Sequence, residues 1–137
     1  MTMKAKGSRS ERELVHMFNS TGIWSAVRIA GSGLTKDPNP DVLAGNNLRY
    51  LAIECKAVKS TSKYLYPEEV DQIANFSKRF GAEAWFGIKF NNKGWFFLKP
   101  EQLNKSRSNN LFVITFDIAN KEGLSFDDLL GEVIKDG

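Results

Sequence analysis

The sequence predicts an α/β domain in which a central mixed β-sheet is flanked by helices. Helix-like segments with one apolar face alternate with short strand-like segments in the order α-β-β-β-α-β-β-β-α. An order of this kind favours a sheet covered by helices. The 137 residues suit one domain, and 42% hydrophobic with 26% charged residues excludes collagen-like and disordered chains. We therefore expect residues 1–137 to form a single domain.

The first predicted helix covers residues 9–21. An apolar stripe runs along it until Gly22, a residue type that often ends helices. Ser8, followed three residues later by Glu11, has the form of a capping box. Beyond this helix, alternating apolar residues predict strands, and clusters of Gly, Pro and Asn predict loops. The expected strands are residues 24–30, 41–44 and 49–57, with a loop at 31–40, a turn at 45–47 and a polar loop at 59–63.

The second predicted helix covers residues 67–80, because Pro67 and two acids open it and Gly81 follows it. At about 100° per residue, its apolar side chains span an arc of about 160°, whereas packing on one sheet needs roughly 100°. The edge formed by Phe76 and Phe80 is therefore a candidate for a second contact. The rest of the chain predicts strands at residues 84–90, 95–98 and 111–116, and a last helix from Ser125 to about residue 134.

Composition excludes several classes of protein. No segment has the ~20 apolar residues of a membrane span, and the N-terminus lacks the apolar run of a signal peptide, so we expect a cytoplasmic protein without a membrane partner. Cys55 is the only cysteine and His16 the only histidine, which excludes an internal disulfide and a multi-cysteine zinc site.

The net charge of +3 is small, but its distribution is uneven. Residues 1–36 hold six basic and two acidic residues, and residues 117–137 hold six acidic residues and two lysines. A basic first third suits a protein that presents one face to a polyanion, with ordinary solvated surface charge as the alternative.

Residues that carry chemistry concentrate in the strand at 49–57. Its side chains alternate between faces, so Glu54 and Lys56 share one face and Cys55 takes the other. Flanking apolar residues indicate a central strand, where charged groups are costly unless they are paired or bound to an ion. A structural ion pair between Glu54 and Lys56 is one interpretation.

Asp41, which follows Pro40, adds a second carboxylate. A hairpin that turns near Asn46 would place Asp41 and Glu54 on neighbouring antiparallel strands, within reach of one metal ion. Carboxylates, water and a phosphate oxygen suit Mg²⁺, and Lys56 could neutralise charge that develops on phosphorus. The pattern therefore predicts a site for metal-assisted hydrolysis.

The full pattern, Pro40-Asp41 and Glu54-Cys55-Lys56 behind a helix that bears Glu11, resembles the P-D-(D/E)-x-K nuclease superfamily. Within it, the sequence is similar to the archaeal-type Holliday junction resolvases up to about Pro100. The similar segments are residues 6–14, 27–33, 41–46, 50–56 and 76–81. The resemblance implies a restriction-endonuclease-like fold with an α-β-β-β-α-β core. It also implies a homodimeric endodeoxyribonuclease that resolves four-way DNA junctions by paired, symmetric, metal-dependent hydrolysis, with no small-molecule substrate.

The resemblance further implies a role for particular residues. Asp41 and Glu54 would hold Mg²⁺, for which Mn²⁺ is expected to substitute, with the backbone carbonyl of Cys55 as a third oxygen. Glu11 would complete the acidic cluster through water, Lys56 would lie beside the nucleophilic water, and Ser32 would lie near the scissile phosphate. The residues expected to contact the DNA backbone are Arg9, Arg12, Arg28 and Lys36, and those expected at the dimer interface are Phe76 and Phe80.

Each role has a simpler alternative. Glu11 could only cap its helix, Ser32 could be an ordinary loop residue, and Arg12 and Arg28 could be solvated surface charges. Phe76 and Phe80 could belong to the core. The same site could serve a restriction or repair endonuclease, or the chain could be a non-catalytic module that binds branched DNA.

Overall fold

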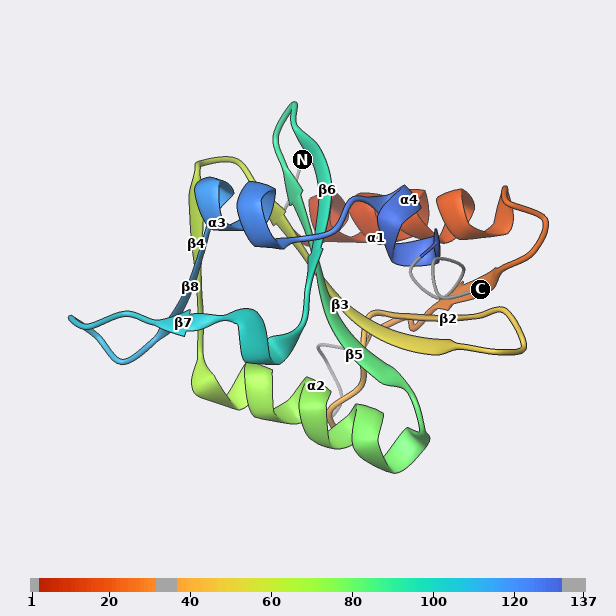
Figure 1. The fold of residues 1–137 in the computed structure, drawn as a ribbon, viewed down its shortest axis with the longest axis horizontal. Coiled ribbons are helices and arrows are strands. Elements are labelled where there is room, and N and C mark those ends of the chain that lie inside the picture. The colour runs from red at the N-terminus through yellow and green to blue at the C-terminus, as the bar shows by residue number, and fades with distance from the viewer. Residues whose placement is uncertain (1–2, 32–36, 132–137) are drawn as a thin grey trace.

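A twisted mixed sheet forms the centre of the fold (Figure 1). The computed structural model describes residues 3–31 and 37–131. Within them, the central sheet has the strand order β1-β2-β3-β5-β6, and β3 and β5 are parallel while the other neighbours are antiparallel. The strands are β1 (Ser25–Arg28), β2 (Val42–Gly45), β3 (Tyr50–Val58), β5 (Glu83–Phe90) and β6 (Gly94–Leu98). The predicted α/β class with a mixed central sheet is confirmed.

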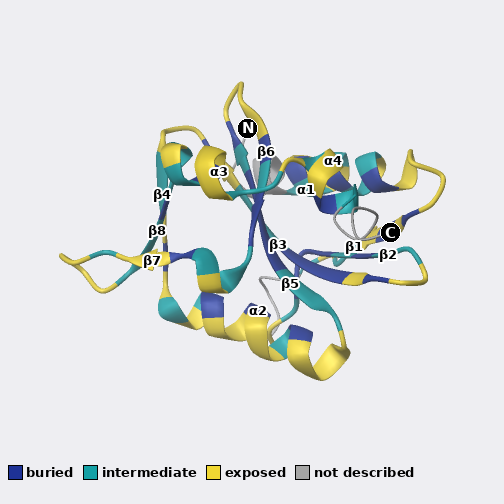
Figure 2. Ribbon diagram, viewed as in Figure 1, coloured by how far each residue is buried: buried dark blue, intermediate teal, exposed yellow. Residues whose placement is uncertain are grey.

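Helices cover both faces of this sheet. α1 (Met3–Asn19) and α4 (Phe126–Gly131) lie on one face, and α2 (Pro67–Phe80) lies on the other (Figure 1). Leu14 and Phe18 of α1 belong to the core on the first face, and Val70 and Ile73 of α2 belong to the core on the second. β3 and β5 are therefore largely buried along their length (Figure 2), as parallel strands between helices usually are.

A second, three-stranded sheet stands beside the central one. Its order is β4-β8-β7, all antiparallel, and we call it the side sheet. Its strands are β4 (Ser62–Leu65), β7 (Asn104–Lys105) and β8 (Phe112–Thr115), and the 3-10 helix η2 (Pro100–Gln102) and α3 (Phe116–Glu122) lie before β7 and after β8. Leu65 and Ile114 are fully buried in the same core as Val70, so the side sheet packs onto the α2 side of the domain.

Arg49 joins three elements at the end of the central sheet. Its guanidinium donates from Nε and Nη2 to the two carboxylate oxygens of Glu83, each at 2.8 Å, and from Nη1 to the carbonyl of Leu129 at 2.6 Å. Only 7% of Arg49 is exposed, and a bidentate pair of this kind is stronger and more directional than a single ion pair. The contact holds the start of β5 beside β3 and fixes α4 on the sheet.

Three local predictions need correction. The first helix begins at Met3, so Ser8 lies inside it and caps nothing; instead, its Oγ accepts a hydrogen bond from Arg28 Nη2 at 2.8 Å. The polar segment 59–63 is not all loop, because β4 begins at Ser62. Phe116 does not end a strand, because Thr115 accepts a hydrogen bond from the Ile118 amide and starts α3 there. Of the described helices, none is long and apolar enough to cross a membrane.

Candidate functional site

The antiparallel pairing of β2 and β3 brings Asp41 beside Glu54. Val42 pairs with Ile53, and the Asp41 amide donates to the Ile53 carbonyl at 3.0 Å. The Cys55 amide in turn donates to Asp41 Oδ2 at 2.9 Å. These two hydrogen bonds fix the Asp41 carboxylate against β3, next to the residue that the hairpin argument predicted as its neighbour.

Glu54 is a buried carboxylate in an acidic surrounding. Burial, and after it the charge of Asp41, raise the pKa of Glu54 from an ordinary 4.5 to about 8. Lys56, whose Nζ lies 4.0 Å from Glu54 Oε2, opposes this rise only in part. Two carboxylates held together in a poorly hydrated place repel each other, and a bound cation relieves that repulsion.

The donor set fits a divalent cation that prefers oxygen. Asp41 and Glu54 supply two carboxylates, and Mg²⁺ commonly takes one or two carboxylates and keeps several waters. Among the described residues, no three His, Cys, Asp or Glu side chains lie close enough together to hold an ion. The site that fits is thus a pair of carboxylates completed by water, rather than a cage of three acidic side chains.

Glu11 approaches this pair from α1 but is engaged with Arg28. Arg28 Nε donates to Glu11 Oε1 at 3.0 Å, and both side chains are largely buried. Burial and the charge of Asp41 raise the pKa of Glu11 despite this ion pair. Glu11 therefore belongs electrostatically to the acidic cluster, and the charge of Arg28 is balanced inside the protein.

Lys56 is held by a residue of α2 that the sequence argument missed. Its Nζ donates to Glu69 Oε1 at 2.5 Å, and Glu69 Oε2 accepts a hydrogen bond from the Tyr66 amide at 3.0 Å. Burial alone would lower the pKa of Lys56, but the hydrogen bond and charge of Glu69, with the charge of Glu54, raise it. Lys56 is therefore an ammonium group at neutral pH, held by the carboxylate of Glu69 and lying 4.0 Å from Glu54 Oε2.

In the sequence, Glu69 is one of two acids in the first turn of the helix at residues 67–80, and that pattern by itself assigns it no role in the site. The available signal was its position as the third residue of a helix that begins shortly after the Glu54-Cys55-Lys56 strand. A carboxylate there can accept hydrogen bonds both from the helix N-terminus and from a lysine on the sheet. Glu68, its neighbour, is exposed and forms no hydrogen bond of either kind among the described residues.

The other predicted site residues lie outside this cluster. Arg9 and Arg12 are exposed on α1, and Ser32 and Lys36 lie outside the described residues. Phe76 and Phe80 stack on each other with ring centroids 5.2 Å apart. Phe76 packs partly against the core on the α2 side, whereas Phe80 is 57% exposed.

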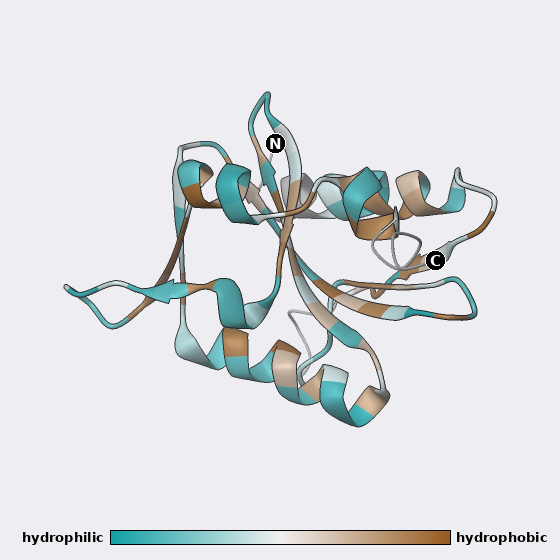
Figure 3. Cartoon of the chain, viewed as in Figure 1, coloured by the Kyte–Doolittle hydropathy of each residue, from teal (hydrophilic) through white to brown (hydrophobic). Residues whose placement is uncertain are grey.

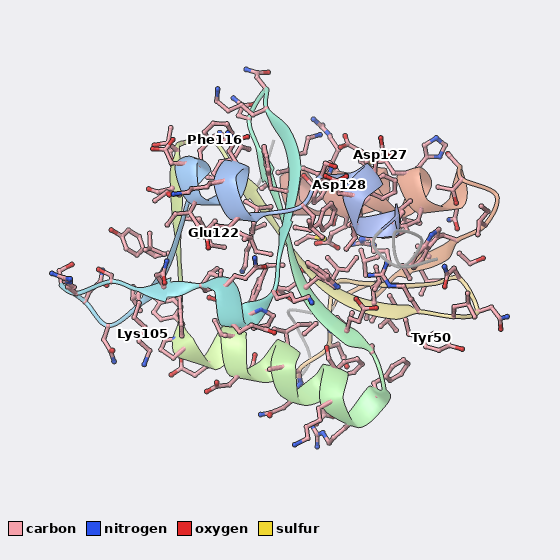
Figure 4. The ribbon with its side chains drawn as sticks, viewed as in Figure 1. Tyr50, Lys105, Phe116, Glu122, Asp127 and Asp128 are labelled. Carbon is pink, nitrogen blue, oxygen red and sulfur yellow. The ribbon has the colours of Figure 1, made fainter. Side chains whose placement is uncertain are left out.

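Phe80 borders an apolar depression on the surface. Val27 and Tyr50, at 59% and 51% exposure, border it too, and Leu43 and Ala44 lie between them. Tyr50 is labelled in Figure 4 at the β2–β3 end of the molecule. We call Val27, Tyr50 and Phe80 the apolar patch. Large exposed apolar side chains gathered in this way are typical of protein contact surfaces.

Comparison with known proteins gives one consistent result. Residues 2–136 match the family described as archaeal Holliday junction resolvase (hjc). The chain is 37% identical to the crossover junction endodeoxyribonuclease Hjc of Archaeoglobus fulgidus over 137 residues, which cover 96% of this chain and all of the relative. It is 31% identical to the endodeoxyribonuclease Hje of Saccharolobus solfataricus over 99 residues, covering 70% of this chain and 73% of the relative. The solved structure of A. fulgidus Hjc superposes with a TM-score of 0.80 at 36% identity, covering 90% of this chain and 98% of that one.

The raised pKa of Glu54 predicts how stability depends on pH. Between pH 4.5 and about 8, the unfolded chain has lost a proton that folded Glu54 keeps, so this residue makes the free energy of unfolding fall as pH rises through that window. Glutamine does not titrate. In EDTA, we expect Glu54→Gln to match the wild type near pH 4.5 and to exceed it by about 2 to 4 kcal/mol near pH 8, measured by urea denaturation.

Glu68→Gln, which removes an exposed acid, is the matched control and should follow the wild-type curve. Millimolar Mg²⁺ at pH 8 should stabilise the wild type and not Glu54→Gln, because the cation binds the ionised carboxylate. Parallel pH curves for the wild type and Glu54→Gln would contradict the prediction.

Proposed function

The chain belongs to the archaeal Holliday junction resolvase family and is a crossover junction endodeoxyribonuclease, and from this premise we propose which of its residues perform the reaction. The observation that carries the proposal is the contact of Asp41 with β3, beside Glu54 and Lys56. Because the family match runs along nearly the whole chain, it favours a junction resolvase over the restriction or repair endonuclease and the non-catalytic module.

Asp41 and Glu54 would hold the divalent cation that the reaction needs. When bound, Mg²⁺ polarises a phosphoryl oxygen and makes a coordinated water more acidic, and Mn²⁺ is able to take its place. The backbone carbonyl of Cys55 would supply a third oxygen from the protein. Glu11 acts through water, because its carboxylate already accepts a hydrogen bond from Arg28.

Lys56 supplies positive charge rather than a base. Its raised pKa keeps it protonated, so it cannot take the proton of the attacking water. The attacking water gives a proton to solvent as its oxygen bonds to phosphorus, and the P–O bond to the leaving sugar oxygen breaks while that oxygen takes up a proton from solvent. Negative charge grows on the phosphoryl oxygens during this step, and a fixed ammonium group stabilises that charge. Ser32 and the basic residues Arg9, Arg12, Arg28 and Lys36 contact the phosphates around the cleavage point.

The working unit is a homodimer that joins through the apolar patch. One chain with one site makes one cut, and two opposed cuts need two sites related by a two-fold axis. Phe80 and Tyr50 are large and exposed, and a second copy would remove them from water. Phe76, stacked under Phe80, supports the contact from the core side.

The first prediction from the proposed function is that DNA cleavage depends on Asp41. With Mg²⁺, we expect the protein to convert a four-way junction into nicked duplexes and to leave a linear duplex with the sequence of the arms uncut. In EDTA, we expect no cleavage of the junction. Asp41→Asn should lower the rate about a thousandfold, because cation binding supplies several kcal/mol. Its amide oxygen can still accept the Cys55 hydrogen bond, so the fold should survive, and Asp71→Asn on the exposed side of α2 is the control. Cleavage by Asp41→Asn at the wild-type rate would exclude this site.

The second prediction concerns Glu69 as the residue that positions Lys56. Glu69→Leu should lower kcat about tenfold with KM within twofold of the wild type, because Lys56 loses its fixed place but the DNA contacts remain. Glu69→Gln should restore most of kcat, since an amide oxygen can accept from Lys56 Nζ and from the Tyr66 amide. Glu68→Leu changes the same helix turn and should have no effect. An equal loss in Glu68→Leu and Glu69→Leu would show that only the helix start matters.

The third prediction tests the dimer. Phe80→Asp should give the mass of one chain in light scattering at micromolar concentration while the wild type gives the mass of two, because a buried unpaired carboxylate is costly at an interface. Phe80 is the better position than the half-buried Phe76, where an acid would also disturb the core. Lys78→Asp, on the exposed surface of the same helix, is the control. A wild-type mass of one chain, or a Phe80→Asp mass of two, would contradict this interface.

A further inference from the structure

The side sheet carries an excess of positive charge that the reaction site does not use. Residues 59–66 and 104–115, which contain its three strands, hold four basic residues and no acid. The other 117 residues of the chain hold fifteen basic and sixteen acidic ones. These twenty residues therefore carry a net charge of +4, and the other 117 carry a net charge of −1. The four basic residues are Lys59, Lys63, Lys105 and Arg107.

Within the described residues, these four basic side chains stand outside the ion pairs of the protein. Lys59, Lys105 and Arg107 are exposed, and Lys63 is half-buried. Among the described residues, none of the four lies within ion-pair distance of a carboxylate, in contrast to Arg28, which is paired with Glu11 near the reaction site. Lys105 instead rests its Nζ 5.5 Å from the ring centre of Phe112, which gives it a defined place on the sheet.

The side sheet begins next to the reacting residues. β3, which carries Glu54 and Lys56, continues through residues 59–61 into β4. Against the effect of burial, the hydrogen bonds from Lys56 and the Tyr66 amide lower the pKa of Glu69, and the charges of Lys56 and then of Lys63 add to this. From there, the hairpin formed by β7 and β8 extends away from the rest of the domain (Figure 1), and its tip is hydrophilic (Figure 3). Lys105 lies on this projecting part (Figure 4).

Strand pairing places two of the lysines on one face of the side sheet. Leu65 and Lys105 both pair with Phe112, and Lys63 lies two residues from Leu65 on β4. Paired residues and residues two apart point to the same side of a sheet. Lys63 and Lys105 therefore lie on the face of the side sheet that also bears the buried Leu65 and Ile114. They stand on its two outer strands, separated by two strand spacings, or roughly 10 Å.

Arg107 sits at a hairpin tip that is ordered by its own hydrogen bonds. The Ser106 amide donates to the Leu111 carbonyl at 2.6 Å, and the Leu111 amide donates to Asn109 Oδ1 at 3.1 Å. Hydroxyl, amide and guanidinium groups are the usual partners of nucleic-acid phosphates. An ordered, basic and acid-free tip of this composition fits a phosphate backbone.

We propose that the side sheet binds the phosphate backbone of one DNA arm, away from the branch point, through Lys63, Lys105 and Arg107. This inference rests on the proposed function, since it extends the same substrate outward from the site at Asp41 and Glu54. The contact adds affinity without reading bases, because backbone contacts position a protein and carry no sequence information. It also requires an arm long enough to reach the hairpin.

The test measures binding of four-way junctions in an Asp41→Asn background, in EDTA, by fluorescence anisotropy. The junctions carry arms of 6, 10, 15 and 20 base pairs. The double variant Lys105→Glu/Arg107→Glu is compared with Lys93→Glu/Lys121→Glu, which makes the same charge change on the β5–β6 turn and α3. Circular dichroism checks that both variants are folded.

On the longest arms, we expect the hairpin variant to bind at least tenfold more weakly than the unchanged hairpin, and the control to lose less than threefold. The slope of log K against log salt should become less steep by about 2, the value for two lost phosphate contacts. On the shortest arms the difference between hairpin variant and control should disappear.

Equal losses in the two variants, or a loss that does not depend on arm length, would overturn the proposal and leave only a general effect of net charge. An unchanged affinity of the hairpin variant would overturn the proposal as well, and an acidic protein would then be the partner that this surface fits. Failure of the Asp41→Asn protein to prefer junctions over linear duplex would instead count against the proposed function. The two failures are therefore distinguishable.

Discussion

The mutual repulsion of two buried carboxylates, Asp41 and Glu54, is the constraint around which the site is built. The hydrogen bond from the Cys55 amide fixes Asp41 beside Glu54, and burial, with the charge of Asp41, raises the pKa of Glu54 to about 8. A protein retains such an arrangement at a cost in stability when function requires it. The acidic pair has little value to folding and much to binding a cation beside a phosphate.

Two ion pairs lie next to these two carboxyl groups. Lys56 lies between Glu54 and Glu69, and Arg28 lies against Glu11, so each cation is held by a carboxylate from a helix on its own side of the sheet. The helices are in turn held by cores on both faces and by the bidentate contact of Arg49 with Glu83. Packing far from the site thereby determines the position of the charges within it, because a buried side chain can move only as far as its helix does.

Basic residues divide into two groups with different uses. Arg28 and Lys56, near the reaction site, are paired with Glu11 and Glu69 inside the protein, where they set the position and protonation of acidic groups. Those of the side sheet face solvent without a carboxylate partner among the described residues and suit contact with an external polyanion. A net charge of +3 for the whole chain conceals this division, since pairing cancels the first group.

The sequence alone determined the fold class, the helix at residues 67–80 and the approach of Asp41 to Glu54, because these depend on local periodicity and on one short hairpin. The sequence prediction was wrong about the start of the first helix. Ser8 does not cap that helix; it accepts a hydrogen bond from Arg28. Only the tertiary structure brought Glu69 to Lys56 and placed β4 beside β8, since both contacts join segments whose distance in space no local pattern encodes. The same reason explains the charge of the side sheet: its two segments lie some forty residues apart in the chain and became one surface only when the strands paired.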